Sequence, residues 1–203
     1  MKVLLVNGSP HADGNTRLAL EEVSKVLNEE GIETVFVNIG VKPVPGCIAC
    51  YKCYETGVCV FNQGVYAEIR EILETGVDGF VFGSPTYYAG PNGSLCSLMD
   101  RLFYSLGRYF KDKPAAAVGV ARRGGAVQTV DRINKYFAIS SMPIVTSQYW
   151  NLAFGREPGD VLKDGEGMQT MRTIGHNLAA LLKAAAGKLS QERETPIRTN
   201  FIR

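Results

Sequence analysis

The feature that most constrains the fold is a regular alternation of short apolar runs with longer segments of helical periodicity. We expect strands at 3–6, 34–39, 80–82, 115–121 and 143–149. Between them apolar residues recur at helical spacing, as at Leu20, Val23 and Leu27. Because such an alternation builds βαβ units, the sequence predicts an α/β fold with a doubly wound, five-stranded parallel sheet of order 2-1-3-4-5 and helices on both faces.

Length and composition favour one domain. The chain has 203 residues, of which 45% are hydrophobic and 21% charged, so it can bury a core without staples. We expect a single domain over 1–203, with a cysteine-rich loop at about 40–62 and a C-terminal tail at about 188–203. The irregular stretches 40–62 and 151–165 are long for a compact domain, where such loops usually serve a function or are disordered.

Charge and hydropathy limit the classes of partner. A net charge of +2, spread over residues of both signs, gives no basic stripe and argues against nucleic acid. No stretch approaches the roughly 20 apolar residues of a membrane helix, and the N-terminus lacks a secretion signal. We therefore expect no membrane partner and a cytoplasmic location, where the five cysteines are thiols or metal ligands rather than disulfides.

The loop after the first strand, GSPHADGNT, has the features of a phosphate site. Its glycines allow tight turns, and Ser9, Asn15 and Thr16 are short donors at the start of a helix, where amides are unpaired and the dipole is positive. His11 could also donate to an anion or could be solvated. The loop is neither the triphosphate nor the dinucleotide motif, so a single terminal phosphate is favoured. The alternative is a polar turn in which Asn15 or Thr16 only caps the helix.

Two further loops follow neighbouring strands and should lie at the same edge of the sheet. The sequence SPTYYAGPNG offers flat apolar surface beside exposed backbone amides, which suits a planar ring; Tyr87 and Tyr88 could instead serve packing or a dimer contact. The sequence ARRGGA lets a ring approach the backbone, and Arg122 could stabilise negative charge on a reduced flavin or could simply be solvated.

These three motifs, in this order and spacing, resemble the NADPH-dependent FMN reductases and, more closely, the iron-sulfur flavoproteins. The resemblance covers nearly the whole chain and implies a flavodoxin-like fold. It implies FMN phosphate on the first loop, and the ring between 85–90 and 121–125. The residues proposed to bind the cofactor are Ser9, His11, Asn15, Thr16, Pro85, Thr86, Tyr87, Tyr88, Gly90, Ala121, Arg122, Gly124 and Gly125.

The loop after the second strand carries four cysteines in a C-x2-C-x2-C-x5-C run. Cys47, Cys50 and Cys53 can turn inward around one centre, and Cys59 can close it, which is ferredoxin-like spacing for a 4Fe-4S cluster. The run also matches the compact cysteine motif of the iron-sulfur flavoproteins. Free or redox-reactive thiols are the main alternative, followed by zinc or an occasional disulfide. Cys96 stands apart and is expected to be a small apolar residue.

Taken together, we expect an FMN-dependent oxidoreductase linked to NAD(P)H or ferredoxin, a flavin or quinone-type reductase that could relay electrons through the cluster. No side chain is expected to act as a catalytic acid or base, because the cofactor carries the chemistry. Two other classes remain open, a non-enzymatic electron-transfer protein and a regulatory module with an empty pocket. The resemblance also implies a homodimer or homotetramer.

Overall fold

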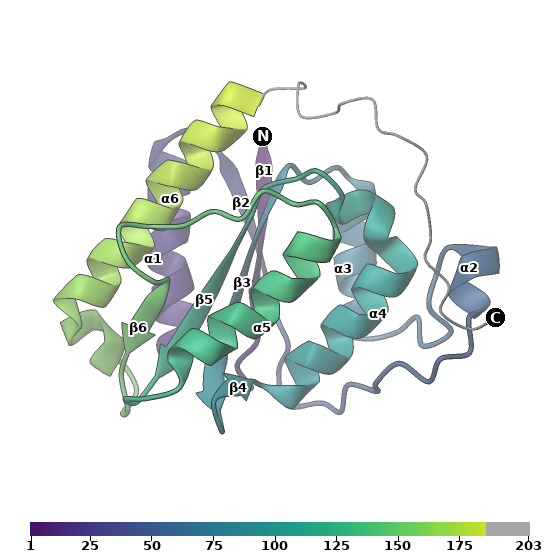
Figure 1. Cartoon of the computed structure of the whole chain (residues 1–203), viewed down its shortest axis with the longest axis horizontal. Helices are drawn as coiled ribbons and strands as arrows, with labels where there is room; N and C mark the ends of the chain where they lie inside the picture. The colour runs from purple at the N-terminus through teal and green to yellow at the C-terminus, as the bar shows by residue number, and fades with distance from the viewer. Residues whose placement is uncertain (186–203) are drawn as a thin grey trace, which may run out of the picture.

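Helices and strands alternate along a computed structural model that describes residues 1–185 (Figure 1). The strands are β1 (Lys2–Asn7), β2 (Glu33–Asn38), β3 (Gly79–Tyr87), β4 (Gly90–Pro91), β5 (Ala115–Ala121) and β6 (Leu152–Phe154). The helices are α1 (Asn15–Glu29), α2 (Lys52–Thr56), α3 (Val65–Glu74), α4 (Gly93–Phe110), α5 (Ala126–Ile139), the 3-10 turn η1 (Asp160–Lys163) and α6 (Gly165–Ala185). The predicted tail at 188–203 lies outside the described residues.

The sheet has six strands, and five of them are parallel in the order β2-β1-β3-β5-β6. The predicted α/β fold is thereby confirmed. The predicted order 2-1-3-4-5 differs in its numbers because the structure contains a two-residue strand, β4, that was not predicted. This strand pairs antiparallel with the end of β3, so the strands after it are numbered β5 and β6. Since β1, β3 and β5 are adjacent and parallel, the loops that follow them meet at one edge of the sheet.

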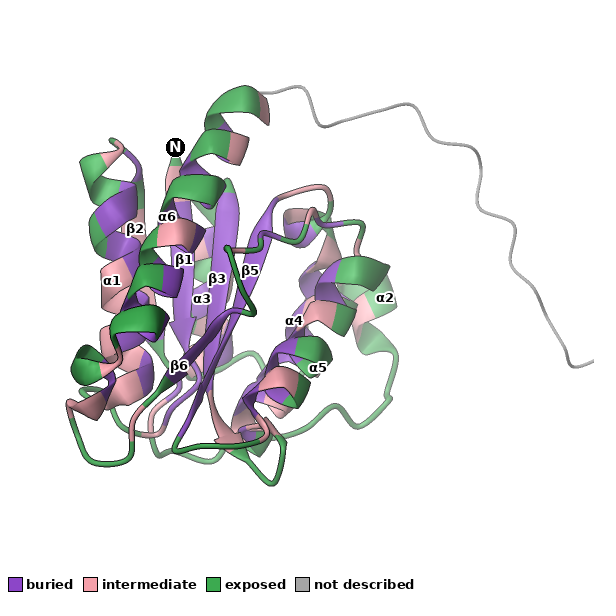
Figure 2. Ribbon diagram, turned by 60° about the vertical axis from the view of Figure 1, so that its left-hand side comes forward, coloured by how far each residue is buried: buried purple, intermediate pink, exposed green. Residues whose placement is uncertain are grey.

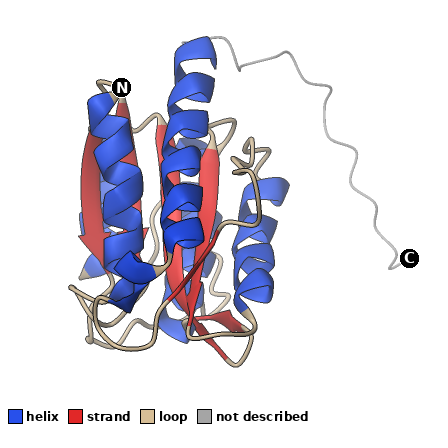
Figure 3. Ribbon diagram, turned by 90° about the vertical axis from the view of Figure 1, so that its left-hand side faces the viewer, coloured by secondary structure: helices blue, strands red, loops and turns tan. Residues whose placement is uncertain are grey.

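Alternate residues of the central strands build two separate cores. Val3 and Leu5 pack with α1 and α6, whereas Leu4 and Val6 face α3, α4 and α5. Figure 3 shows the resulting three layers, and in Figure 2 the strands are buried while the outer helix faces are exposed. None of the helices in the described part of the chain is long and apolar enough to cross a bilayer.

The fifth predicted strand, 143–149, is wrong. Only Ile144 in this segment forms a bridge, to Ala115, and the edge strand β6 begins later, at Leu152. Pro143 has no amide proton to donate to a ladder. The Ser147 hydroxyl donates to the Tyr149 carbonyl at 2.7 Å, and the Asn151 side chain donates to the Val145 carbonyl at 3.0 Å. These contacts turn the chain away from β5 after Val145, and pairing with β5 resumes only at Leu152.

Candidate functional site

The predicted loops meet in a pocket of about 680 Å³ at the carboxyl edge of the sheet. Residues after β1, β3 and β5 line it, as the strand order requires, together with a fourth segment at 155–158. The predicted residues in its wall are Ser9, His11, Asn15, Thr16, Pro85, Thr86, Tyr87, Ala121 and Arg122. The volume lies in the range of sites for small molecules and cofactors.

The N-terminus of α1 opens onto this pocket without a side-chain cap. Gly14 is the N-cap residue, no side chain accepts from the first amides, and the first turn holds no acidic residue. The alternative in which Asn15 or Thr16 caps the helix is therefore excluded. Ser9 and Thr16 are both nearly buried beside these amides. Unpaired amides and a positive dipole end form an anion-binding surface.

The loop after β1 is tightly placed against its neighbours. A Cβ at Gly8 would lie 2.6 Å from Leu95 Cδ2 and 2.7 Å from the carbonyl oxygen of Gly83, so only glycine fits there. The Ser9 amide donates to Asn7 Oδ1 at 3.1 Å, and the Ser9 hydroxyl accepts from the His11 amide at 3.1 Å. The loop is thus held by its own polar groups and by Asn7 at the end of β1.

The side chain of Asn15 is used differently from our expectation. Its Nδ2 donates to the Glu157 carbonyl at 2.9 Å, and its Oδ1 accepts from the Val161 amide at 3.3 Å. Gly155 passes so close that a Cβ would lie 2.9 Å from Asn15 Nδ2. Asn15 therefore ties the 155–161 loop to the start of α1, and its backbone amide remains part of the helix N-terminus.

The β3–β4 hairpin forms the facing wall. Thr86 accepts a hydrogen bond from the Thr129 hydroxyl at 3.0 Å, which joins the hairpin to α5. The two residues at its tip, Tyr88 and Ala89, have φ of 50° and 57°, and Tyr88 is fully exposed. Such left-handed values are costly for residues other than glycine and form a type I′ turn.

Four predicted site residues lie outside the pocket wall, namely Tyr88, Gly90, Gly124 and Gly125. Gly125 instead lies under the hairpin, where a Cβ would be 3.0 Å from Ala89 Cα. Its φ of 87° also requires a left-handed backbone. At its other end the hairpin continues directly into α4. The N-cap residue of this helix, Asn92, donates its backbone amide to the Ser84 hydroxyl at 2.9 Å.

Sequence reasoning missed the fourth wall of the pocket. Gly155, Arg156 and Pro158 line it, and Arg156 adds a second cation to that of Arg122. The exposed Arg156 pairs with its neighbour Glu157 at 3.1 Å, its one ion pair within residues 1–185. The unusual length of the 151–165 stretch was the one available signal, because this segment contains no glycine-rich or other recognisable motif.

The four clustered cysteines line one small pocket of about 20 Å³ beside helix α4. Cys53 lies in the short α2, and left-handed residues at Ala49 and Tyr51 reverse the chain on either side of Cys50. Burial raises the pKa of Cys53, and the nearby charges of Cys59, Cys47 and Cys50 raise it further. The three other thiols are therefore close enough to Cys53 to interact with it electrostatically.

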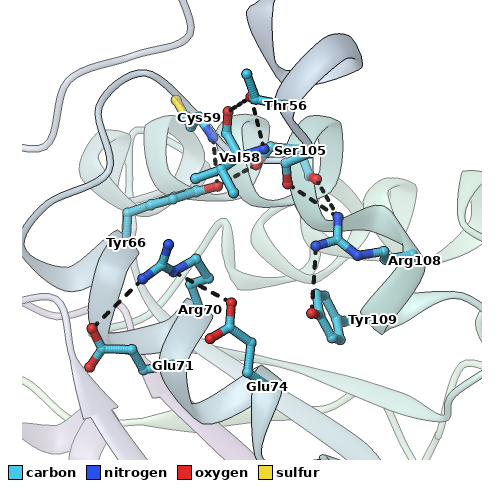
Figure 4. Close-up of polar contacts among 11 residues, drawn as sticks. Thr56, Val58, Cys59, Tyr66, Arg70, Glu71, Glu74, Ser105, Arg108 and Tyr109 are labelled. Atoms are coloured by element: carbon cyan, nitrogen blue, oxygen red, sulfur yellow. Dashed lines mark hydrogen bonds and ion pairs between the residues drawn. The ribbon is translucent and has the colours of Figure 1, made fainter.

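Polar contacts from α3 and α4 hold this cysteine segment (Figure 4). The Cys59 amide donates to the hydroxyl of the buried Tyr66 at 3.0 Å, and that hydroxyl contacts Ser105. Arg108 donates to the Gly57 carbonyl at 3.1 Å. The segment is anchored near its C-terminal end although most of its residues are exposed.

The chemistry of the donor set fits an iron-sulfur cluster, because four cysteine thiols border one pocket. All five cysteines are free, and within residues 1–185 no group of three or more acidic, histidine or cysteine side chains could hold one ion. One zinc ion needs sulfurs at about 2.3 Å from the metal. A 4Fe-4S cluster takes four cysteine thiolates.

Comparison with known proteins decides the family. A model of the NADPH-dependent FMN reductase family matches residues 1–157. The chain belongs to the NADPH-dependent FMN reductase family. Among its relatives, an iron-sulfur flavoprotein of Methanocaldococcus jannaschii is 36% identical to this FMN reductase family member over 191 residues, which cover 90% of this chain and 98% of the relative. The resemblance that the motifs indicated is confirmed, and family membership supports a flavin-dependent oxidoreductase with FMN as its cofactor.

Solved structures agree on the fold of this FMN reductase family member. RosB, crystallised with 8-demethyl-8-formylriboflavin-5'-phosphate, matches with a TM-score of 0.70 at 14% identity, over 100% of this chain and 92% of RosB. An archaeal flavodoxin matches with a TM-score of 0.59 at 17% identity, over 90% of this chain and 99% of the flavodoxin. The flavodoxin-like fold is thereby confirmed.

Proposed function

We propose that the chain is an FMN-dependent oxidoreductase that receives electrons from NAD(P)H or a reduced ferredoxin and passes them to a small-molecule acceptor, with a 4Fe-4S cluster on Cys47, Cys50, Cys53 and Cys59 as a relay. The observation that carries the proposal is the uncapped N-terminus of α1, which opens into the large pocket. A neutral ligand would leave those amides unpaired, whereas a phosphate would satisfy them.

Each wall of the pocket has a distinct role in this proposal. The first loop, with Ser9 and Thr16, binds the phosphate, while 85–87 and 121–122 flank the ring. Arg122 and Arg156 contribute positive charge that favours negative charge on the ligand. The bound flavin supplies one- and two-electron redox chemistry, and the protein contributes position and electrostatics.

The phosphate site can be tested by comparing FMN with riboflavin, which lacks the phosphate. Thr16→Asp places a negative charge at the helix N-terminus and should weaken FMN binding by about 100-fold without changing riboflavin affinity. Thr16→Val at the same position should have a much smaller effect, because it adds no charge.

A second variant avoids any change in the buried part of the loop. Asp13 is exposed and lines the pocket, so Asp13→Asn should fold normally and tighten FMN a few-fold, again leaving riboflavin unchanged. Isothermal titration on the apoprotein measures both affinities. Equal responses of FMN and riboflavin in these variants would contradict a phosphate site at α1.

The cluster and the electron donor need a separate experiment. Protein purified without oxygen should contain four iron and four sulfide per chain, as expected for a 4Fe-4S cluster. NAD(P)H oxidation with free flavin or a quinone would support the reductase, whereas reduction by ferredoxin alone would indicate an electron carrier. Protein that contains flavin but binds no iron after anaerobic reconstitution would overturn the relay and leave a simple flavin reductase.

A further inference from the structure

The structure holds a buried positive charge next to the cysteine pocket. Arg101, near the middle of α4, is only 2% exposed, yet it forms no ion pair with any carboxylate of residues 1–185. Its Nε has no hydrogen-bond partner among the residues that the structure describes. A buried, uncompensated charge is costly, so such groups are normally paired with an anion.

The contacts of Arg101 offset this cost only in part. Nη1 donates to the Pro45 carbonyl at 3.0 Å and Nη2 to the Phe61 carbonyl at 2.9 Å. The guanidinium carbon also lies 4.8 Å from the centre of the Tyr66 ring. These partners are neutral dipoles, and therefore none of them neutralises the charge.

The carboxylates on the neighbouring elements are not available to Arg101. Asp100 accepts from the Tyr136 hydroxyl at 2.6 Å. Glu68 on α3 borders a pocket that Arg101 also borders, but within residues 1–185 the two form no ion pair, and burial, with repulsion from Glu71, raises the pKa of Glu68 and so disfavours its charged form. A further source of negative charge is the pocket that Arg101 lines together with Cys47, Cys50, Cys53 and Cys59.

We propose that Arg101 is a positioning residue for the cysteine centre, with two linked tasks. Its guanidinium joins the two ends of the cysteine segment, at Pro45 and Phe61, and its charge balances the negative charge of the thiolate ligands. A cluster core bound by four thiolates keeps a net negative charge, which a buried cation stabilises. This inference rests on the cluster in the proposed function and adds the group that tunes it.

A residue that served only to join the loop ends would behave differently from a counter-charge. Arg101→Lys keeps the charge and loses the two-pronged contact, whereas Arg101→Gln loses the charge and keeps a donor. The matched control is Arg108→Gln, because Arg108 also lies on α4 and donates to a carbonyl of the cysteine segment, but it is exposed, so solvent screens its charge.

The test uses the anaerobically purified, iron-loaded protein. We expect Arg101→Gln to lose iron to a chelator at least about tenfold faster than the wild type, with Arg101→Lys and Arg108→Gln much closer to the wild type. The midpoint potential of the cluster should be lower in Arg101→Gln than in Arg101→Lys, because one-electron reduction adds a negative charge that the cation stabilises. The flavin spectrum and thermal unfolding of each variant report whether the fold is intact.

The outcomes separate this inference from the proposed function. If the wild-type protein binds no iron, both the cluster in the proposed function and the role of Arg101 as its counter-charge are refuted. If the wild type carries the cluster, but Arg101→Lys and Arg101→Gln lose iron equally fast, then only the loop contact matters and the charge role is refuted. If Arg101→Gln retains too little cluster for its midpoint potential to be measured, the rates of iron loss from Arg101→Gln and Arg101→Lys still decide whether the charge matters.

Discussion

The side-chain amide of Asn15 donates to the carbonyl oxygen of Glu157 at 2.9 Å, across 142 residues of sequence. This contact, with the bond from the Val161 amide to Asn15 Oδ1, joins the helix that opens onto the pocket to the loop that forms its fourth wall. One polar side chain therefore connects the first and last parts of the site.

Asn15→Ala should release this loop. Because the two hydrogen bonds are lost, the loop around the exposed Arg156 should open more often. Tryptic cleavage after Arg156 should then accelerate several-fold. Limited proteolysis followed by mass spectrometry measures the rate. Asn28→Ala on the same helix is the control, since the Asn28 side chain bonds Ser24 and Thr34 and does not reach the 155–161 loop in the described structure. Equal acceleration in both variants would contradict a specific tie.

Gly8→Ala should destabilise the protein by about 2 kcal/mol. The added methyl would overlap Leu95 and the Gly83 carbonyl oxygen, and moving β1 away from β3 would also distort the phosphate loop. Gly93→Ala provides the comparison, because nothing lies within 4 Å of a Cβ there and alanine suits a helix better. Urea unfolding should give a lower midpoint for Gly8→Ala alone, and unchanged stability would contradict the close approach.

The double substitution Tyr88→Asn with Ala89→Gly should raise stability by about 1 kcal/mol. Asparagine followed by glycine is the favoured pair for a type I′ turn, whereas tyrosine and alanine are strained at positive φ. Tyr88 is fully exposed, so its removal costs little packing. Thermal unfolding checks the gain, and Tyr88→Ala, which keeps the left-handed strain, should stay within about 0.5 kcal/mol of the wild type. A lower melting temperature in the double variant would show that the strain is not there.

Tyr136→Phe should lower stability at neutral pH by about 1 kcal/mol, because the hydrogen bond to Asp100 at 2.6 Å is lost. Burial, and then the bond to Asp100, raise the pKa of Tyr136 in the folded state. A raised pKa means that the stabilising contribution is complete below the unfolded pKa near 10 and declines as the pH rises towards the folded value.

The difference between wild type and Tyr136→Phe should therefore shrink above about pH 10. Urea unfolding at several pH values between neutral and alkaline measures it. Tyr104→Phe is the matched control, since Tyr104 is 58% exposed on α4 and should show no such trend. A difference that stays constant up to the highest pH would contradict the assignment.

Sequence patterns predicted those parts of the fold that depend on continuous burial. The strands at 3–6 and 115–121 were located because both of their faces are apolar and buried. Strand β4 could not be found, because it follows a turn with Tyr88 and Ala89 at positive φ, which carries none of the usual turn residues.

In the candidate site, too, the sequence predicted local features and missed those that depend on distant residues. The first loop was predicted from local chemistry, namely glycines and short donors before a helix. The part played by Asn15 depends on Glu157, and that of Arg101 on Pro45 and Phe61, residues far away in sequence. Only the tertiary fold reveals that Arg101 is buried, since a lone arginine on an amphipathic helix gives no such indication.

Helix α4 begins directly after the hairpin wall of the large pocket and reaches Arg101 eight residues later, a span of about 12 Å along its axis. Its one irregular residue, Leu106, comes after Arg101, so this span is a straight spacer of fixed length. The distance along α4 between the β3–β4 hairpin and Arg101 is thus set by helix geometry and not by the cysteine segment. A change in the length of the exposed part of the 46–60 segment would therefore leave that distance unchanged, because neither of its ends lies on the segment.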